Sequence, residues 1–201
     1  SCHFIGDLLY EKPYYDWIED DSQDKGYYDL VRPYLQNDDL SIANLETPIG
    51  GKELNISGTG YSFNASREIG KQVASLDLEV VSTANNHAND RGNQGIDNTL
   101  DFLKEKDILA VGTYYNQDDR DQGKYMTIHG IKFGFVSYTY ATNQIVSDEN
   151  QAKVALFNRP SDRKMTQAYK DLLTKEVTQT RENCDVLIAM MHWGNEFTYD
   201  I

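Results

Sequence analysis

Short segments that favour strands alternate with segments of helical periodicity along the whole chain, and this alternation constrains the fold most strongly. Residues 40–45 and 186–191 are apolar and strand-sized, whereas residues 96–103 repeat apolar side chains every three to four positions. Strands that are joined by crossover helices assemble into a largely parallel or mixed sheet. The pattern therefore predicts an α/β fold.

The expected elements follow from the same periodicities. The longest helix is predicted over residues 162–183, with Ser161 as its N-cap. Shorter helices are predicted over residues 27–34, 69–76 and 96–103. The segments 125–128 and 132–135 predict a β-hairpin, so the sheet should not be purely parallel. Strands are predicted at residues 2–5, 40–45, 78–83, 108–111, 125–128, 132–138 and 186–191.

Composition fits a folded domain. A chain of 201 residues that is 39% hydrophobic can bury a sizeable core. No linker divides it, so residues 1–201 are interpreted as a single domain. The chain stops just after a segment rich in chemically active side chains, so we expect this domain to be incomplete at its C-terminal end.

Charge limits the partners. The formal net charge is −13, from 32 acidic and 19 basic residues. A phosphate backbone would be repelled, and no Lys or Arg cluster compensates, so no nucleic acid is expected as a partner. The cysteines Cys2 and Cys184 could pair only if their strands were neighbours, which the sequence leaves open.

Four metal-capable side chains follow strand-like runs at the ends where open α/β sheets bind ligands. Asp7, Glu46, Asn86 and His192 offer carboxylate, amide and imidazole donors. A divalent metal that activates water or holds a phosphate needs hard oxygen donors together with imidazole nitrogen. The sequence therefore predicts a divalent-metal site at these strand ends.

Each residue also has a structural explanation. Asp7 could cap a turn, and Glu46 could be an ordinary surface carboxylate. The triplet Asn85, Asn86 and His87 could belong to a loop rich in turn-forming residues. His192 could be a buried histidine that is hydrogen bonded within the core. His3 and His129 are interpreted as structural.

Taken together, the motifs resemble the CapA family of bacterial capsule and poly-γ-glutamate synthesis proteins. The resemblance covers essentially the whole chain, and its most specific parts are the last two blocks. The motifs are Gly6-Asp7, Asn44-Leu45-Glu46, Ala84-Asn85-Asn86-His87 with Asp90, Gly92 and Gly95, and His192-Trp193-Gly194-Asn195-Glu196-Phe197.

That family is similar to the calcineurin-like metallophosphoesterases, which implies a four-layer α/β/β/α sandwich with a two-metal site. By this resemblance, the metal ligands would be Asp7, Glu46, Asn86 and His192. His87 would be the catalytic acid that contacts phosphate and protonates the leaving oxygen. Asn85 and Glu196 would contact the substrate. The implied cofactors are divalent ions, namely Mn, Fe or Zn.

The chain departs from the broader phosphoesterase pattern at two places. Those enzymes carry Asp-x-His on the first strand, whereas this sequence has Asp7-Leu8-Leu9. They also carry a late Gly-His-x-His segment, which these residues do not contain. The remaining donors suit a weak single site better than a tight dinuclear one, so we expect weak or absent metal binding by this chain.

The resemblance implies a role in capsule or poly-γ-glutamate biosynthesis or export. The partners would be the synthesis machinery at the membrane, and the protein would be extracytoplasmic, held by an anchor outside this chain. Two alternatives remain open: a metal-dependent phosphoesterase that acts on a small or lipid-linked phosphate, and a noncatalytic scaffold that has lost its metal.

Overall fold

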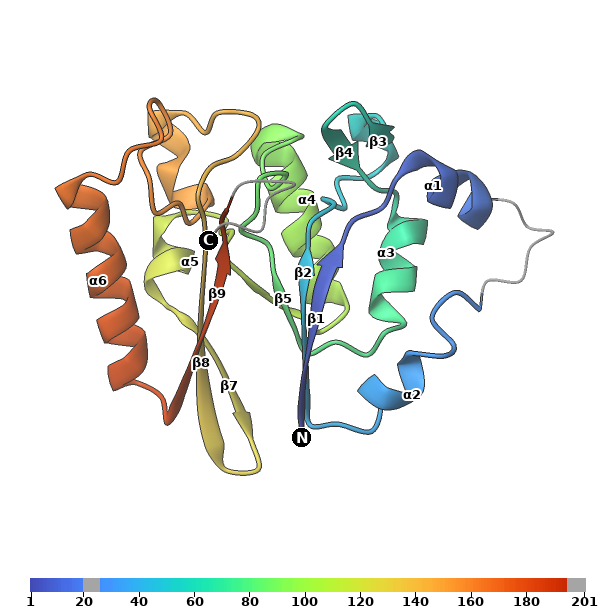
Figure 1. The fold of residues 1–201 in the computed structure, drawn as a ribbon, viewed down its shortest axis with the longest axis horizontal. Coiled ribbons are helices and arrows are strands. Elements are labelled where there is room, and N and C mark those ends of the chain that lie inside the picture. The colour runs from blue at the N-terminus through green and yellow to red at the C-terminus, as the bar shows by residue number, and fades with distance from the viewer. Residues whose placement is uncertain (20–25, 195–201) are drawn as a thin grey trace.

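The computed structural model describes residues 1–19 and 26–194, and its first sheet is parallel (Figure 1). Its strand order is β1-β2-β5-β6, and each neighbouring pair runs in the same direction. This topology confirms the α/β class expected from the sequence. The strands are β1 (Cys2–Leu8), β2 (Leu40–Leu45), β5 (Val80–Ser82) and β6 (Leu109–Val111).

The second sheet has the order β7-β8-β9 and mixes both strand directions. The predicted hairpin is present as the antiparallel pair β7 (Lys124–Ile128) and β8 (Ile131–Thr139). Strand β9 (Val186–His192) returns parallel to β8 after a long crossover helix, as the sequence pattern requires.

The helices cover the sheets with their apolar faces. Helices α3 (Arg67–Ala74) and α4 (Gly92–Glu105) confirm the predicted helices at 69–76 and 96–103. Ile69, Val73 and Phe102 pack with Ala43 and Val81 of the first sheet in one buried cluster. Helix α6 (Gln167–Glu182) packs on β8 and β9.

Another buried cluster joins the two sheets. It contains Ile42 and Val80 from the first sheet together with Phe135 from the second. A buried hydrogen bond of 2.7 Å between the hydroxyls of Ser82 and Ser137 also links β5 to β8. The two sheets are therefore held together close to the strand ends where the predicted site residues lie.

Two helix predictions were wrong in their extent. The helix predicted from residue 162 begins at Gln167, capped by Thr166 and not by Ser161. An ion pair between Arg159 and Asp162 closes a turn there instead. The helix predicted over 27–34 is only α2 (Arg32–Leu35), because Pro33 fits the first turn of a helix and not its interior.

Several short elements had no clear periodic signal. A helix of eight residues, α1 (Lys12–Glu19), precedes the gap in the described residues. A small hairpin, β3 (Ser57–Thr59) and β4 (Ser62–Asn64), lies beyond the carboxyl end of β2. The remaining pieces are α5 (Gln117–Asp121) and the 3-10 turns η1 (Lys52–Leu54) and η2 (Asp148–Lys153).

Two further facts concern thiols and membranes. Cys2 and Cys184 are both free in the structure. None of the helices in residues 1–19 and 26–194 combines the length and the apolar composition needed to cross a membrane.

Candidate metal centre

Three of the predicted ligands come together in space. Asp7, Glu46 and His192 each place a ligand atom within 4.8 Å of the other two. Asp7 lies on β1, Glu46 directly follows β2, and His192 ends β9. The group therefore draws on both sheets, although the strands that carry it are far apart in the sequence.

A bulge in β1 decides where the Asp7 side chain goes. Phe4 pairs with Ile42, but the next pair is Asp7 with Asn44, so β1 has one residue more than β2 in this interval. In a regular register Asp7 would pair with Leu45 and face the opposite side of the sheet. The extra residue turns Asp7 to the side of Asn44 and Glu46, as bulges near functional sites commonly do.

Asn44 holds the two carboxylates together. Its amide nitrogen donates to Asp7 Oδ1 at 2.8 Å and lies 3.4 Å from Glu46 Oε2. Its amide oxygen accepts from Asn85 Nδ2 at 3.1 Å. Glu46 is buried whereas Asp7 is exposed, so the pair is open to solvent on one side only.

Asn86 meets His192 at the same place. His192 Nε2 lies 2.9 Å from Asn86 Oδ1, so the ring nitrogen donates to the amide oxygen when it carries a proton. Together with the Asp7 and Glu46 carboxylates, the Asn86 amide oxygen and the His192 imidazole form a mixed oxygen and nitrogen donor set that fits a divalent metal.

The ring of His192 is poised in its neutral form. Burial lowers the pKa of His192 below its usual value, and the nearby His87 acts in the same direction, whereas the Asp7 carboxylate opposes them. A metal ligand must be a neutral imidazole, so little protonation has to be reversed before His192 can bind an ion at neutral pH.

His87 is buried, is not among the residues that line the cavity described below, and is held by Asp90. Its Nδ1 lies 2.7 Å from Asp90 Oδ2, and both side chains are almost completely inaccessible to solvent. The same carboxylate oxygen accepts the backbone N–H of Phe63 at 2.7 Å. Asp90 therefore fixes the ring and favours a proton on Nδ1.

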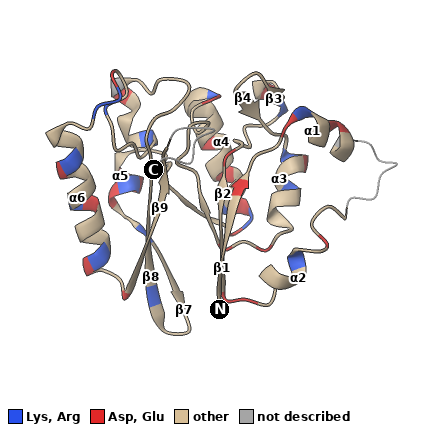
Figure 2. Ribbon diagram, viewed as in Figure 1, with Lys and Arg blue, Asp and Glu red and all other residues tan. Residues whose placement is uncertain are grey.

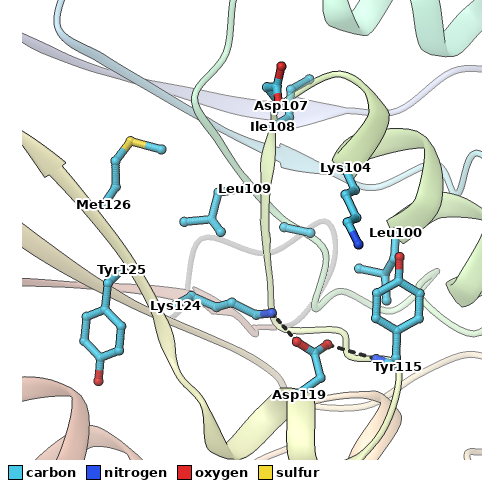
Figure 3. A pocket seen from close by; sticks show the side chains of 11 residues that line it. Leu100, Lys104, Asp107, Ile108, Leu109, Tyr115, Asp119, Lys124, Tyr125 and Met126 are labelled. Carbon is cyan, nitrogen blue, oxygen red and sulfur yellow. Dashed lines mark hydrogen bonds and ion pairs between the residues drawn. The ribbon is translucent and has the colours of Figure 1, made fainter.

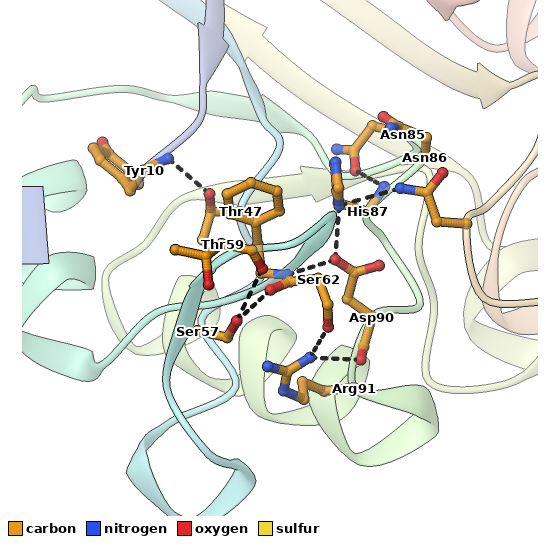
Figure 4. A network of polar contacts seen from close by, with 12 residues as sticks. Tyr10, Thr47, Ser57, Thr59, Ser62, Asn85, Asn86, His87, Asp90 and Arg91 are labelled. Atoms are coloured by element: carbon orange, nitrogen blue, oxygen red, sulfur yellow. Dashed lines mark hydrogen bonds and ion pairs between the residues drawn. The ribbon is translucent and has the colours of Figure 1, made fainter. Parts of the chain in front are cut away.

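The β3–β4 hairpin completes the support of this loop (Figure 4). The ring of Phe63 meets that of His87 edge on, with centroids 4.6 Å apart. Arg91 donates to Ser62 Oγ at 2.6 Å, as Figure 4 shows. It also donates to the carbonyl oxygen of Leu54 at 2.9 Å. The hairpin, which the sequence pattern did not reveal, thus positions the predicted acid.

Of the two predicted substrate contacts, Asn85 and Glu196, the structure describes only Asn85. Asn85 is buried, and its Nδ2 donates to the carbonyl oxygen of Leu45 at 2.9 Å while its Oδ1 accepts from His87 N–H. It therefore ties the loop after β5 to the end of β2, and a contact with substrate stays a prediction. Glu196 lies outside the described residues.

A cavity of about 500 Å³ opens over this group. Sequence reasoning missed part of its wall, because loop residues such as Asn143 and Arg163 belong to no recognisable motif. Asn143 nevertheless donates its backbone N–H to the Asn86 carbonyl at 2.7 Å. The cavity is lined by Asp7, Leu9, Glu46, Asn86, Thr139, Tyr140, Ala141, Asn143, Arg163, His192, Trp193 and Gly194.

A second cavity, of about 450 Å³, lies between α4, β6 and β7 (Figure 3). It is lined mainly by apolar residues, and none of the predicted site residues reaches it. Two of its charged residues pair with each other, because Lys124 Nζ lies 2.7 Å from Asp119 Oδ1. It offers no comparable set of donors, so the metal-capable cavity is the better candidate site.

The order and spacing of these residues match a known family along the entire chain. The model of the bacterial capsule synthesis protein PGA_cap matches residues 1–201. The chain belongs to this family. Membership agrees with the resemblance carried by the motifs around Asp7, Glu46, His87 and His192.

Two capsule or PGA biosynthesis proteins are similar to this chain in sequence. The capsule biosynthesis protein CapA of Bacillus anthracis is 27% identical over 176 residues, which are 83% of this chain and 40% of that protein. The PGA biosynthesis protein CapA of Bacillus subtilis strain 168 is 22% identical over 205 residues, covering 100% of this chain and 50% of that protein. The chain thus spans about half the length of these relatives, or less.

Proposed function

We propose that this chain acts in capsule or poly-γ-glutamate biosynthesis or export through a metallophosphatase-like site. The observation that carries the proposal is the convergence of Asp7, Glu46 and His192 within 4.8 Å beside an open cavity. Family membership supports the biological role, because both named relatives are biosynthesis proteins for capsule or PGA.

The fold that we propose is the four-layer α/β/β/α sandwich of the metallophosphoesterases, formed by residues 1–201 as one domain. The cluster of Ile42, Val80 and Phe135 between the sheets supports two facing β layers. Helix α3 packs against the first sheet and α6 against the second, which supports an outer helical layer on each side.

In this proposal Asp7, Glu46, Asn86 and His192 hold a divalent ion, either Mn, Fe or Zn. A bound ion would supply Lewis-acid polarisation of a phosphoryl oxygen and a lowered pKa for water. The side chains do the rest. Asn44 orients both carboxylates, and Asp90 holds Nδ1 of His87, whose other ring nitrogen would give a proton to the leaving oxygen when both ring nitrogens are protonated.

The decisive experiment is a manganese titration of the chain and of its His192→Ala variant. Because His192 supplies one of few donors, the variant is expected to bind manganese about 10- to 100-fold more weakly, with metal-dependent turnover of p-nitrophenyl phosphate lost in parallel. Calorimetry and a chelator-sensitive activity assay give the two readings.

The matched control is His129→Asn. His129 lies in the β7–β8 turn with φ of 49°, contacts Asp39 and does not line the cavity, and Asn tolerates that conformation. Equal manganese affinity in His192→Ala and His129→Asn would disprove the metal centre.

A weaker but diagnostic effect is expected for Asn44→Ala. Without the amide that bridges them, the Asp7 and Glu46 carboxylates lose their fixed orientation, so manganese should bind about tenfold more weakly. Asn37→Ala, which removes an exposed amide that donates to the Pro33 carbonyl, serves as the control in the same titration. Unchanged affinity in Asn44→Ala would mean that the carboxylates need no such support.

The second candidate is a noncatalytic scaffold. Leu9 lines the cavity where the broader phosphoesterases would offer a histidine, which favours fewer than two ions and weaker chemistry. A scaffold would bind its partner with or without chelator, whereas the enzyme would lose activity with chelator. We propose the synthesis machinery at the membrane as the partner and an extracytoplasmic, membrane-anchored location.

A further inference from the structure

The cavity over the candidate metal centre has a cationic side as well as an acidic one. Arg163 is the basic residue among its described lining residues, opposite in charge to Asp7 and Glu46. Its exposed side chain forms no hydrogen bond or ion pair with any residue of 1–19 and 26–194. An arginine that faces a cavity without a protein partner is available to a ligand anion.

The loop before α6 is built to present Arg163. The backbone N–H of Arg163 donates to the Arg159 carbonyl at 2.8 Å, and Arg159 N–H donates to the Lys164 carbonyl at 3.0 Å. Asp162 accepts from Arg159 Nε and from the Lys164 N–H, and the bond from Arg159 lowers the pKa of Asp162 to about 2. Figure 2 shows this loop as one of the places where Lys and Arg gather.

Arg163 itself has a φ of 54°, in the left-handed region that side-chain-bearing residues seldom adopt. Such a conformation persists only where surrounding bonds impose it. Here the Arg159–Asp162 pair closes the turn that imposes it. Asn158, just before this turn, also donates to the Tyr140 carbonyl at 3.3 Å, which ties the loop to the cavity wall.

An aromatic rim completes the cavity. Trp193 and Tyr140 both line it, and both keep part of their rings exposed. Each packs edge on against the buried ring of Phe157, with centroid separations of 6.0 Å for Trp193 and 5.8 Å for Tyr140. These rings provide apolar area for the organic part of a ligand, next to the Arg163 charge.

We infer that the cavity binds an organic phosphate, with Arg163 pairing to the phosphate oxygens and Trp193 and Tyr140 contacting the attached organic group. A phosphate monoester offers three acceptor oxygens, so the Arg163 guanidinium can bind two of them and leave one for the proposed metal centre. A carboxylate offers only two. The inference adds Arg163, Trp193 and Tyr140 as the residues that recognise the substrate of the proposed phosphatase-like site, and in that sense it rests on the proposed function.

The test measures the fluorescence of Trp193. The chain has Trp17 and Trp193 as its tryptophans, so Trp17→Phe leaves Trp193 as the single indole reporter. Fluorescence titration with phenyl phosphate, without added metal, should show binding that Arg163→Ala weakens about tenfold or more, because a charge-assisted hydrogen bond is lost. Arg163→Lys should retain part of the affinity, since lysine keeps the charge but not the planar fork.

Lys164→Ala is the matched control, because Lys164 is the exposed neighbour that does not line the cavity. Its affinity for phenyl phosphate should equal that of the parent. Phenol and phenylacetate share the ring of the probe and separate the contributions of phosphate, carboxylate and aromatic contact; phenyl phosphate should bind the most tightly.

Equal binding of phenyl phosphate by Arg163→Ala and its parent, or no binding by the parent, would overturn the inference. Equal or tighter binding of phenylacetate would overturn the assignment to phosphate. A parallel manganese titration keeps the two proposals distinct. If Arg163→Ala binds phenyl phosphate as tightly as the parent while the parent binds manganese, this inference alone is refuted. If Arg163→Ala weakens phenyl phosphate binding but the parent does not bind manganese, the metal centre alone is refuted.

Discussion

Replacing His87 by alanine is expected to lower kcat for p-nitrophenyl phosphate by about 10² to 10⁴ while leaving manganese affinity unchanged. The reason is that His87 is held by Asp90 and lies next to the predicted ligand Asn86, but is not itself among the converging donors. Its proposed task is proton transfer to the leaving oxygen, which affects turnover and not metal binding. Steady-state kinetics and calorimetry on the same preparation measure both quantities.

Because His87 is buried, alanine could also disturb the loop. His87→Asn therefore accompanies it, since an amide can still donate to Asp90 and contact Phe63 but cannot serve as the acid. Both variants should lose turnover. The melting temperature of His87→Asn should equal that of the parent. Turnover preserved in His87→Asn would exclude His87 as the proton donor, and the scaffold proposal would gain support.

The largest stability effect is expected for Arg120→Ala. Arg120 is buried in α5 and forms two hydrogen bonds with Glu176 of α6, at 2.6 and 3.1 Å. Tyr138 also donates to Glu176 at 2.7 Å. Removing the guanidinium leaves a mostly buried carboxylate without its countercharge, which should cost about 3 to 5 kcal/mol of unfolding free energy. Urea denaturation at neutral pH measures this loss.

Two comparisons separate charge from packing. Arg67→Ala breaks the exposed pair with Glu105 and should change stability little, because solvent screens that pair. Replacing both partners, as Arg120→Met with Glu176→Leu, should recover most of the loss, since no buried charge then remains unpaired. A loss in the double variant as large as that in Arg120→Ala would assign the effect to packing.

Much of the site could be predicted from the sequence because Glu46, Asn86 and His192 each follow an apolar strand. Carboxyl ends of parallel strands meet at one edge, so the approach of Glu46 and Asn86 follows once β2 and β5 are recognised, whereas His192 joins them from the second sheet. The class of fold follows from the same alternation, as do α3 and α4, whose apolar spacing matches one helix face.

Other features depended on contacts that no local pattern encodes. The bulge that turns Asp7 toward Asn44 depends on how β1 pairs with β2, and Gly6 alone does not predict it. The turn that presents Arg163 is closed by an ion pair, so residues 162–166 look helical in the sequence but are not in α6. The small β3–β4 hairpin has strands too short to give a periodic signal.

The split of the donor group between two sheets also has a consequence for the order of events during synthesis. Asp7 and Glu46 are made early, whereas His192 lies on the last described strand, whose pairing with β8 places it beside them. A nascent chain has no complete set of donors until that long-range pairing is made. Loading with an ion would therefore be a late step that only a correctly assembled molecule can complete.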